Sequence, residues 1–200
     1  MKVSAFQKES WYLFIYFQEV VIMVNVKKLI RNLTVSGLCV ALGIVLPIAF
    51  HSIPNAGSVM LPMHLPVLLC GLICGPYFGL LCGLLTPFLS CVITSMPSWG
   101  YLPSMLCELA VYGLAAGLLA KIVVTKYRTL NIYISLLGSM ICGRIVYGII
   151  NALIFRSGNY SMQIWITSMF ITALPGIIIQ LVIIPIIILA LQQSKLISVS

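Results

Sequence analysis

Apolar residues run almost without interruption through most of the chain, and turn-forming residues divide them into separate segments. No Asp, Glu, Lys or Arg occurs in the 76 residues between Arg31 and Glu108. A helix needs about 20 apolar residues to cross a bilayer, so this stretch alone is long enough for three crossings. We predict six crossings, over approximately residues 33–50, 59–74, 76–96, 101–120, 130–155 and 169–191. Period-2 alternation is absent, and helices pair every backbone group internally, so each crossing is expected to be helical.

The composition agrees with this pattern and excludes a soluble domain. About 62% of the residues are hydrophobic and only 7% are charged, whereas a soluble domain carries roughly 25% charged residues. The sequence therefore predicts an all-α polytopic membrane protein. Its net charge of +8 is a poor argument for nucleic-acid binding, and we expect no nucleic-acid partner.

The positions of the basic residues predict the orientation of the chain. With six crossings, both termini lie on the same side, and seven basic residues share that side: Lys27, Lys28, Arg31, Lys121, Lys126, Arg128 and Lys195. By the positive-inside rule this side is cytoplasmic. Arg156 alone falls in an outer loop. We therefore expect a multi-pass protein of the cell membrane with cytoplasmic N- and C-termini.

Residues 1–22 do not fit the pattern of crossings. The segment from Trp11 to Met23 is apolar and aromatic, but Gln18 and Glu19 interrupt it and it is short for a crossing. Residues 1–22 are expected to form either an interfacial helix or a dispensable segment, and residues 23–200 a single six-helix membrane domain.

Several kinds of catalytic chemistry are excluded by residues that the chain lacks. It has three Glu and no Asp, so paired-carboxylate chemistry is nearly excluded and a Ser/His/Asp triad is impossible. No Gly-Lys dipeptide occurs, which rules out a P-loop. The seven cysteines lie in apolar segments without metal-binding spacing and are expected to act as small hydrophobes. We predict no catalytic residues, no metal site, no cofactor and no enzymatic activity.

Three ionisable residues lie inside the predicted crossings, and each is a candidate for a functional site because burying such a group in a bilayer is costly. They are His64, Glu108 and Arg144. At about 1.5 Å rise per residue, all three fall in the outer half of the membrane. Tyr112 follows Glu108 by four residues, which places both on one helix face.

Two further polar residues extend the candidate site along the helix of Arg144. Tyr147 and Asn151 follow it at i+3 and i+7, on the same face. Trp99 would lie at the outer mouth, beside Tyr101. We interpret the set as a pocket for a small polar solute, with the Arg144 guanidinium offering a fork of donors to a carboxylate or phosphate.

Each part of this interpretation has a structural alternative. Glu108 and Arg144 would serve structure alone if they pair with each other and hold two helices together. His64 is equally a candidate for a satisfied histidine at a helix interface. Trp99 and Tyr101 are equally typical of the aromatic belt at a membrane surface.

Small residues recur at intervals of four, a spacing that lets helices approach closely. One set favours packing inside the protein: Gly71, Gly75, Gly79, Gly83, Gly113 and Gly117. Gly37 and Ala41 show the same spacing in the first crossing. For this pair, an internal contact and a docking face for another subunit both remain open.

Three stretches of the chain resemble the substrate-binding S-components of energy-coupling-factor (ECF) vitamin transporters. They are LTVSGLCVALGIVLP at residues 33–47, LPMHLPVLLCGLICGPYFGLLCGLLTPFLS at residues 61–90 and CELAVYGLAAGLL at residues 107–119. The resemblance covers about residues 27–192. Within the family, the stretches MHLPVLLCG and CELAVYG look closest to S-components for pantothenate.

The resemblance implies a division of labour among subunits. An S-component captures a vitamin from outside a bacterial plasma membrane and delivers it together with a membrane coupling subunit and two cytoplasmic ATPases. Small residues of the first helix form the docking face in that family, which corresponds here to Gly37 and Ala41. Arg144 favours pantothenate because that vitamin carries a carboxylate, and hydroxymethylpyrimidine and pyridoxine are the alternative ligands.

A stand-alone proton-coupled transporter is the alternative from another functional class, with Glu108 as its proton site. Such carriers often contain inverted repeats. Comparison of residues 33–96 with residues 101–191 reveals no convincing internal repeat.

Overall fold

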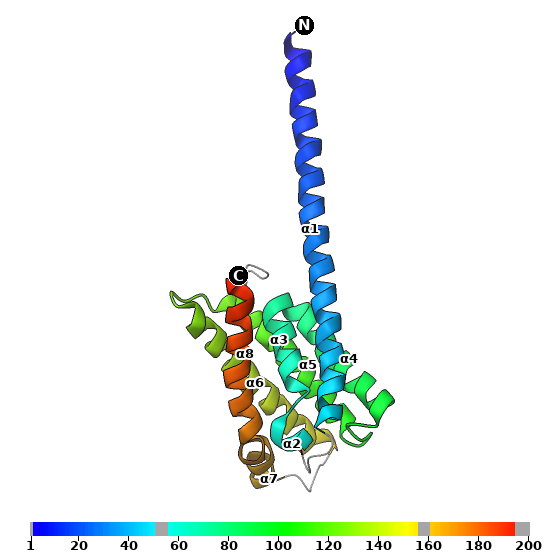
Figure 1. Cartoon of the computed structure of the whole chain (residues 1–200), viewed down its shortest axis with the longest axis vertical. Coiled ribbons are helices and arrows are strands. Elements are labelled where there is room, and N and C mark those ends of the chain that lie inside the picture. Colours follow the sequence, from blue (N-terminus) through cyan, green and yellow to red (C-terminus); the bar gives the residue numbers. More distant parts are fainter. Residues whose placement is uncertain (1, 51–55, 156–160, 195–200) are drawn as a thin grey trace. The chain divides into compact units, whose positions relative to one another are not determined.

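The structure of the chain is a computed structural model. It describes the backbone of residues 2–50, 56–155 and 161–194, and the side chains of residues 26–50, 57–153 and 161–194. These residues form helices and turns without a strand (Figure 1). Among the described residues, six apolar segments are long enough to cross a membrane: Val26–Ala49, Gly57–Cys74, Pro76–Thr94, Leu102–Ile122, Arg128–Leu153 and Leu174–Gln193. The predicted all-α fold with six crossings is confirmed.

The elements follow the predicted segments in order. They are α1 (Lys2–Ala49), α2 (Ala56–Met60), α3 (His64–Cys74), α4 (Pro76–Thr94), α5 (Leu102–Ile122), α6 (Arg128–Ile150), the π-helical turn η1 (Asn151–Phe155), α7 (Met162–Ile166), the π-helical turn η2 (Thr167–Thr172) and α8 (Leu174–Gln193).

The chain divides into two units, residues 1–34 and residues 35–200, and the division falls within α1. In the first unit, the hydroxyl of Thr34 donates to the carbonyl oxygen of Ile30 one turn earlier, at 3.0 Å. The side chains of residues 1–22 lie outside the described set. Their interfacial or dispensable role therefore stays a prediction.

Two predicted crossings are less regular than the sequence pattern suggests. The second crossing breaks between α2 and α3, where Leu61 has a φ of 50° and Pro62 has no backbone N–H to continue a helix. The His64 amide donates to the Leu61 carbonyl oxygen at 3.1 Å and restarts the helix. The sixth crossing begins only at α8, after α7 and η2. These breaks place His64 at the first turn of α3.

The core of the second unit is built around α5, against which α3, α4 and α6 all pack. Glycines allow this approach: a Cβ on Gly113 would lie 2.0 Å from the carbonyl oxygen of Gly79, and one on Gly83 would lie 2.2 Å from that of Leu109. The predicted internal packing of these glycines is confirmed. Gly75 serves differently, because it has a φ of +94° at the turn between α3 and α4, a conformation that favours glycine.

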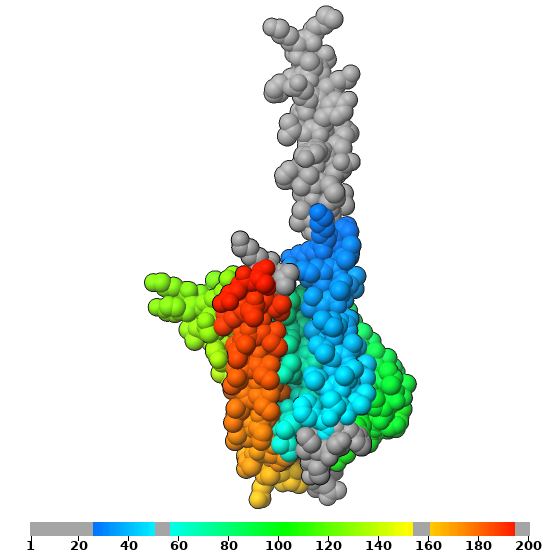
Figure 2. All heavy atoms as spheres, viewed as in Figure 1, coloured from blue at the N-terminus to red at the C-terminus, as the bar shows by residue number. Residues whose placement is uncertain are grey.

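Large apolar side chains cover the outside of the helices, as expected where lipid replaces water as the solvent. Leu38, Leu85 and Val182 are examples, each about half exposed. Figure 2 shows α8 and residues 35–49 of α1 on one face, with α3 visible between them. The thiol of Cys70 on α3 donates to the hydroxyl of Ser36 on α1 at 3.4 Å.

Candidate functional site

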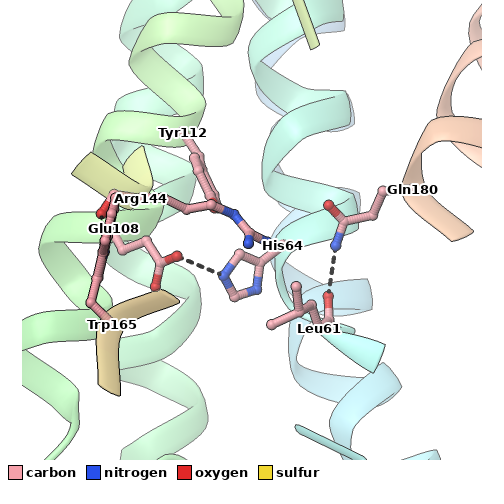
Figure 3. Close-up of polar contacts among 7 residues, drawn as sticks. All are labelled: Leu61, His64, Glu108, Tyr112, Arg144, Trp165 and Gln180. Atoms are coloured by element: carbon pink, nitrogen blue, oxygen red, sulfur yellow. Dashed lines mark hydrogen bonds and ion pairs between the residues drawn. The ribbon is translucent and has the colours of Figure 1, made fainter. Parts of the chain in front are cut away.

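Three helices bring four of the predicted polar residues together in one buried cluster (Figure 3). His64 begins α3, Glu108 and Tyr112 lie one turn apart on α5, and Arg144 lies on α6. His64 Nε2 is 3.6 Å from Glu108 Oε1, and the His64 and Tyr112 rings meet edge to face with centroids 5.2 Å apart. None of the four side chains belongs to an exposed residue, and Arg144 is only 2% exposed.

Arg144 is held mainly by neutral groups. Its Nε donates to the hydroxyl of Tyr112 at 3.1 Å, and its guanidinium carbon lies 5.2 Å from the centre of the Phe170 ring. The indole N–H of Trp165 donates to the Arg144 carbonyl oxygen at 3.1 Å. Nη1 of Arg144 is buried and has no hydrogen-bond partner among the described residues. The side chain therefore retains donor capacity inside the protein.

The pairing of charges differs from the structural alternative raised by the sequence. Among the residues that the structure describes, the one ion pair is between Glu108 and His64, and it forms only when the imidazole is protonated. Glu108 does not pair with Arg144. A buried cation without a paired anion costs several kcal/mol by an order-of-magnitude estimate. The Tyr112 hydroxyl and the Phe170 ring compensate the positive charge of the Arg144 guanidinium only in part. The guanidinium has no carboxylate partner among the described residues.

Asn151 and Tyr147 form a separate, internally satisfied link next to the cluster. Asn151 Oδ1 accepts from the Ser104 hydroxyl at 3.1 Å, which ties η1, directly after α6, to the start of α5. Asn151 Nδ2 donates to the Tyr147 carbonyl oxygen at 2.9 Å. Because the Asn151 side chain has a protein partner for both its polar atoms, its observed contacts are those of a helix-to-helix link.

Trp99 lies outside the buried cluster, in the loop between α4 and α5. Its side chain is 64% exposed, and that of Tyr101 is 53% exposed. These exposures suit aromatic side chains at a membrane surface. The structure thus brings His64, Glu108, Tyr112 and Arg144 together, and does not bring Trp99 to them.

Three residues near the cluster were not predicted from the sequence: Trp165, Phe170 and Gln180. Trp165 and Phe170 meet edge to face at 5.5 Å and cover Arg144. Gln180 is 1% exposed; its Nε2 donates to the Leu61 carbonyl oxygen at 3.3 Å, and its Oε1 has no partner among the described residues. The signal for Gln180 was present, because it is the one polar side chain between Gly176 and Leu191.

Glycines of α6 make room for the aromatic side chains of the site. A Cβ on Gly143 would lie 2.2 Å from the Tyr112 ring, and one on Gly148 would lie 2.6 Å from Trp165 Nε1. Trp165 also borders an apolar cavity of about 250 Å³ between α6 and α7. Aromatic side chains therefore adjoin the cluster, and the apolar cavity borders on Trp165 without including any of the four polar residues.

The two small residues of α1 are both exposed, and they belong to the second unit. A Cβ built on Gly37 meets nothing within 4 Å, whereas one on Gly43 would lie 2.3 Å from Cγ2 of Thr86 on α4. For Gly37, the alternative of a close internal helix contact is thus absent among the described residues.

The buried cluster gathers hydrogen-bonding groups from several helices. Within the described residues, no three His, Cys, Asp or Glu side chains gather in a group that could hold a metal ion. The polar groups are donors and acceptors that point inward from different helices, as in small-molecule sites of helical proteins.

Comparison with known proteins agrees with this description. The chain matches the model of the family described as "ECF transporter, substrate-specific component" over residues 31–188, a region that includes the whole buried cluster. None of the curated proteins and none of the solved structures compared with it matches. The matched family consists of substrate-binding components of transporters rather than of enzymes. With a match over most of its length, the chain belongs to the family of ECF transporter substrate-specific components.

Proposed function

We propose that this protein captures an anionic vitamin, with pantothenate as the favoured ligand, at the outer side of a bacterial plasma membrane. It delivers the vitamin together with a membrane coupling subunit and two cytoplasmic ATPases. Both termini face the cytoplasm in this proposal, as the seven basic residues on that side favour. ATP hydrolysis belongs to the partners, since the chain has no P-loop.

The observation that carries the ligand proposal is the state of Arg144. Arg144 is 2% exposed, its Nη1 has no hydrogen-bond partner among the described residues, and the carboxylate of Glu108 lies 3.6 Å from His64 Nε2 instead of pairing with Arg144. A ligand carboxylate would accept from Nη1 and compensate the buried charge, a charge-assisted hydrogen bond of the stronger kind. An anionic ligand would therefore supply the negative charge that the folded protein does not place beside Arg144.

The neighbours of Arg144 suit the remaining groups of pantothenate, which are hydroxyls and an amide. Glu108 Oε1 and the unpartnered Gln180 Oε1 are acceptors. The hydroxyl of Tyr112 already accepts from Arg144 and has its own proton to donate. Trp165 and Phe170 would cover the apolar part of the ligand. Tyr147, Asn151 and Trp99 stay in the proposed site as residues at its edge.

The edge-to-face pair of Trp165 and Phe170 favours a second ligand class within the same family. A pyrimidine or pyridine ring, as in hydroxymethylpyrimidine or pyridoxine, would stack on an indole with about 1 kcal/mol beyond area burial. Glu108 would then accept from an amine or hydroxyl of the ligand. This alternative predicts that Trp165, and not Arg144, dominates the affinity.

The decisive experiment is to identify the vitamin that co-purifies with the protein by mass spectrometry and to titrate pantothenate, hydroxymethylpyrimidine and pyridoxine by calorimetry. We expect pantothenate to bind and Arg144→Ala to weaken it roughly 30-fold or more, because losing one partner of a buried charge pair costs about 2–5 kcal/mol. Arg144→Lys keeps the positive charge but not the forked donors of the guanidinium, so it should lose less affinity than Arg144→Ala. An unchanged affinity in Arg144→Ala would contradict the proposed role of Arg144 in the site. Tight binding of pyridoxine alone would make pyridoxine the ligand in place of pantothenate.

Uptake into liposomes tests the transport mechanism separately from the ligand. The protein alone should bind vitamin without accumulating it, and accumulation should appear only when the coupling subunit and ATPases are reconstituted with ATP inside. Gradient-driven accumulation by the protein alone would overturn the proposed dependence on ATPases and favour the proton-coupled alternative at Glu108.

A further inference from the structure

A second cavity, of about 280 Å³, lies at the end of the bundle where α5 ends, α6 begins and α8 ends. The basic residues Lys126 and Arg128 line it on the loop side, and both are exposed. Ser135 and Gln192 line it further inside, and Leu72 and Ile188 supply apolar wall. The cavity is therefore polar at its rim and mixed in its interior.

The charge around this cavity is of one sign. Glu108 is the one carboxylate residue between residues 26 and 194, and it lies in the other cluster, 3.6 Å from His64. Lys126 and Arg128 thus have no carboxylate residue of this segment to neutralise them. A site with two cations and no acid favours an anion.

Buried donors inside the cavity point to the same conclusion independently of the surface charge. Ser135 is fully buried, at 0% exposure, and its hydroxyl has no hydrogen-bond partner among the described residues. Both polar atoms of the Gln192 amide are also buried without a partner there. Leaving a buried polar group unsatisfied costs about 1–3 kcal/mol, so these groups are expected to meet a ligand or water.

We propose that this cavity binds a phosphate group, presented by the headgroup of an anionic phospholipid or by a free phosphate ester. The tetrahedral phosphate has acceptors for the Arg128 fork, the Lys126 ammonium, the Ser135 hydroxyl and the Gln192 amide at once. Basic pockets between membrane helices, near the helix ends, are the kind of site that holds anionic lipid headgroups. Leu72 and Ile188 would contact hydrocarbon next to the headgroup of such a lipid.

The proposal is tested on the full-length protein by two measurements with defined probes. Native mass spectrometry compares the retention of phosphatidylglycerol and phosphatidylcholine, and calorimetry titrates glycerol 3-phosphate and inorganic phosphate into protein in zwitterionic detergent. The variants are Arg128→Gln, Lys126→Gln with Arg128→Gln, and Ser135→Ala. Lys121→Gln is the matched control, because Lys121 is exposed at the end of α5 and does not line the cavity. Thermal unfolding of each variant checks that it is folded.

We expect the protein to retain phosphatidylglycerol in preference to phosphatidylcholine. The double variant should lose at least about tenfold in affinity for the phosphate probe. Ser135→Ala should lose roughly tenfold, because it removes one charge-assisted hydrogen bond. Lys121→Gln should leave retention unchanged. Competition by glycerol 3-phosphate supports the headgroup as the bound part, and binding of the soluble phosphates alone assigns a free ester. Equal retention of both lipids without phosphate binding, or an equal loss in Lys121→Gln, would overturn the site.

Discussion

Two sets of small residues with the same spacing lie in opposite surroundings in this protein. On α5, Gly113 faces the backbone of Gly79 so closely that a Cβ would lie 2.0 Å from its carbonyl oxygen. On α1, a Cβ on Gly37 would meet nothing within 4 Å. Both glycines are followed four residues later by another small residue, Gly117 and Ala41 respectively.

The difference shows what a small residue at every fourth position does and does not specify. The spacing removes the steric barrier to a close helix approach, but it does not choose the partner. On α5 the partner is another segment of the same chain. On α1 the small face is left free among the described residues, so the partner, in the proposed function, is the coupling subunit.

The largest effect on folding is expected for Gly113→Ala. The added methyl group would collide with the backbone of α4, which has no flexible end that can move aside, so the helices must separate. We expect a loss of about 3 kcal/mol or more, the upper part of the range for overpacked cores. Denaturant unfolding in detergent measures it. Gly37→Ala is the matched control, and it should unfold no earlier than the wild type, because Ala is the better helix former.

A smaller effect on folding, and a large one on ligand binding, is expected for Gly143→Ala. Its methyl group would overlap the Tyr112 ring, a side chain that can turn aside but only by leaving its hydrogen bond with Arg144. We expect a loss of about 1–2 kcal/mol in stability and at least tenfold in affinity for the vitamin. Calorimetric titration of the folded variant tests this, and full affinity would show that Tyr112 does not position Arg144.

The sequence predicted the fold well because its information was coarse and repeated. Each crossing is predicted from the length and mean hydropathy of a whole apolar segment, so the prediction of six helices does not depend on any single residue. The breaks were harder to predict. Pro62 marks the break in the second crossing, but the φ of 50° at Leu61 occurs beside a close contact between distant segments, where a Cβ on Gly176 of α8 would lie 2.8 Å from the Met60 backbone. Such a contact between distant segments leaves no local pattern.

The candidate site was predictable only as far as polarity inside an apolar helix marks a residue. That signal found His64, Glu108 and Arg144, and applied to α8 it would also have found Gln180. It could not pair Glu108 with His64 rather than with Arg144, because helix rotation and side-chain direction decide the pairing. Trp165 lay between the predicted fifth and sixth crossings and Phe170 at the start of the sixth, where an aromatic residue is ordinarily an interfacial anchor.

The smallest effect on folding is expected for Gly37→Leu, the substitution that tests the docking face directly. The side chain would enter open space, so unfolding and vitamin affinity should match the wild type within about 0.5 kcal/mol. A coupling subunit that needs close helix approach at Gly37 and Ala41 would be kept away by the larger side chain. Co-purification of the reconstituted complex should therefore fall while the isolated protein behaves normally.

Gly43→Leu on the same helix separates this explanation from a general disturbance of α1. Its side chain would collide with Thr86 of α4, so we expect the isolated protein to lose stability before any partner is added. The pair of variants thus divides α1 into a face that packs inside the protein and a face reserved for another chain. Normal complex formation by Gly37→Leu would show that Gly37 is not part of the docking face, because the substitution is not expected to change the packing inside the protein.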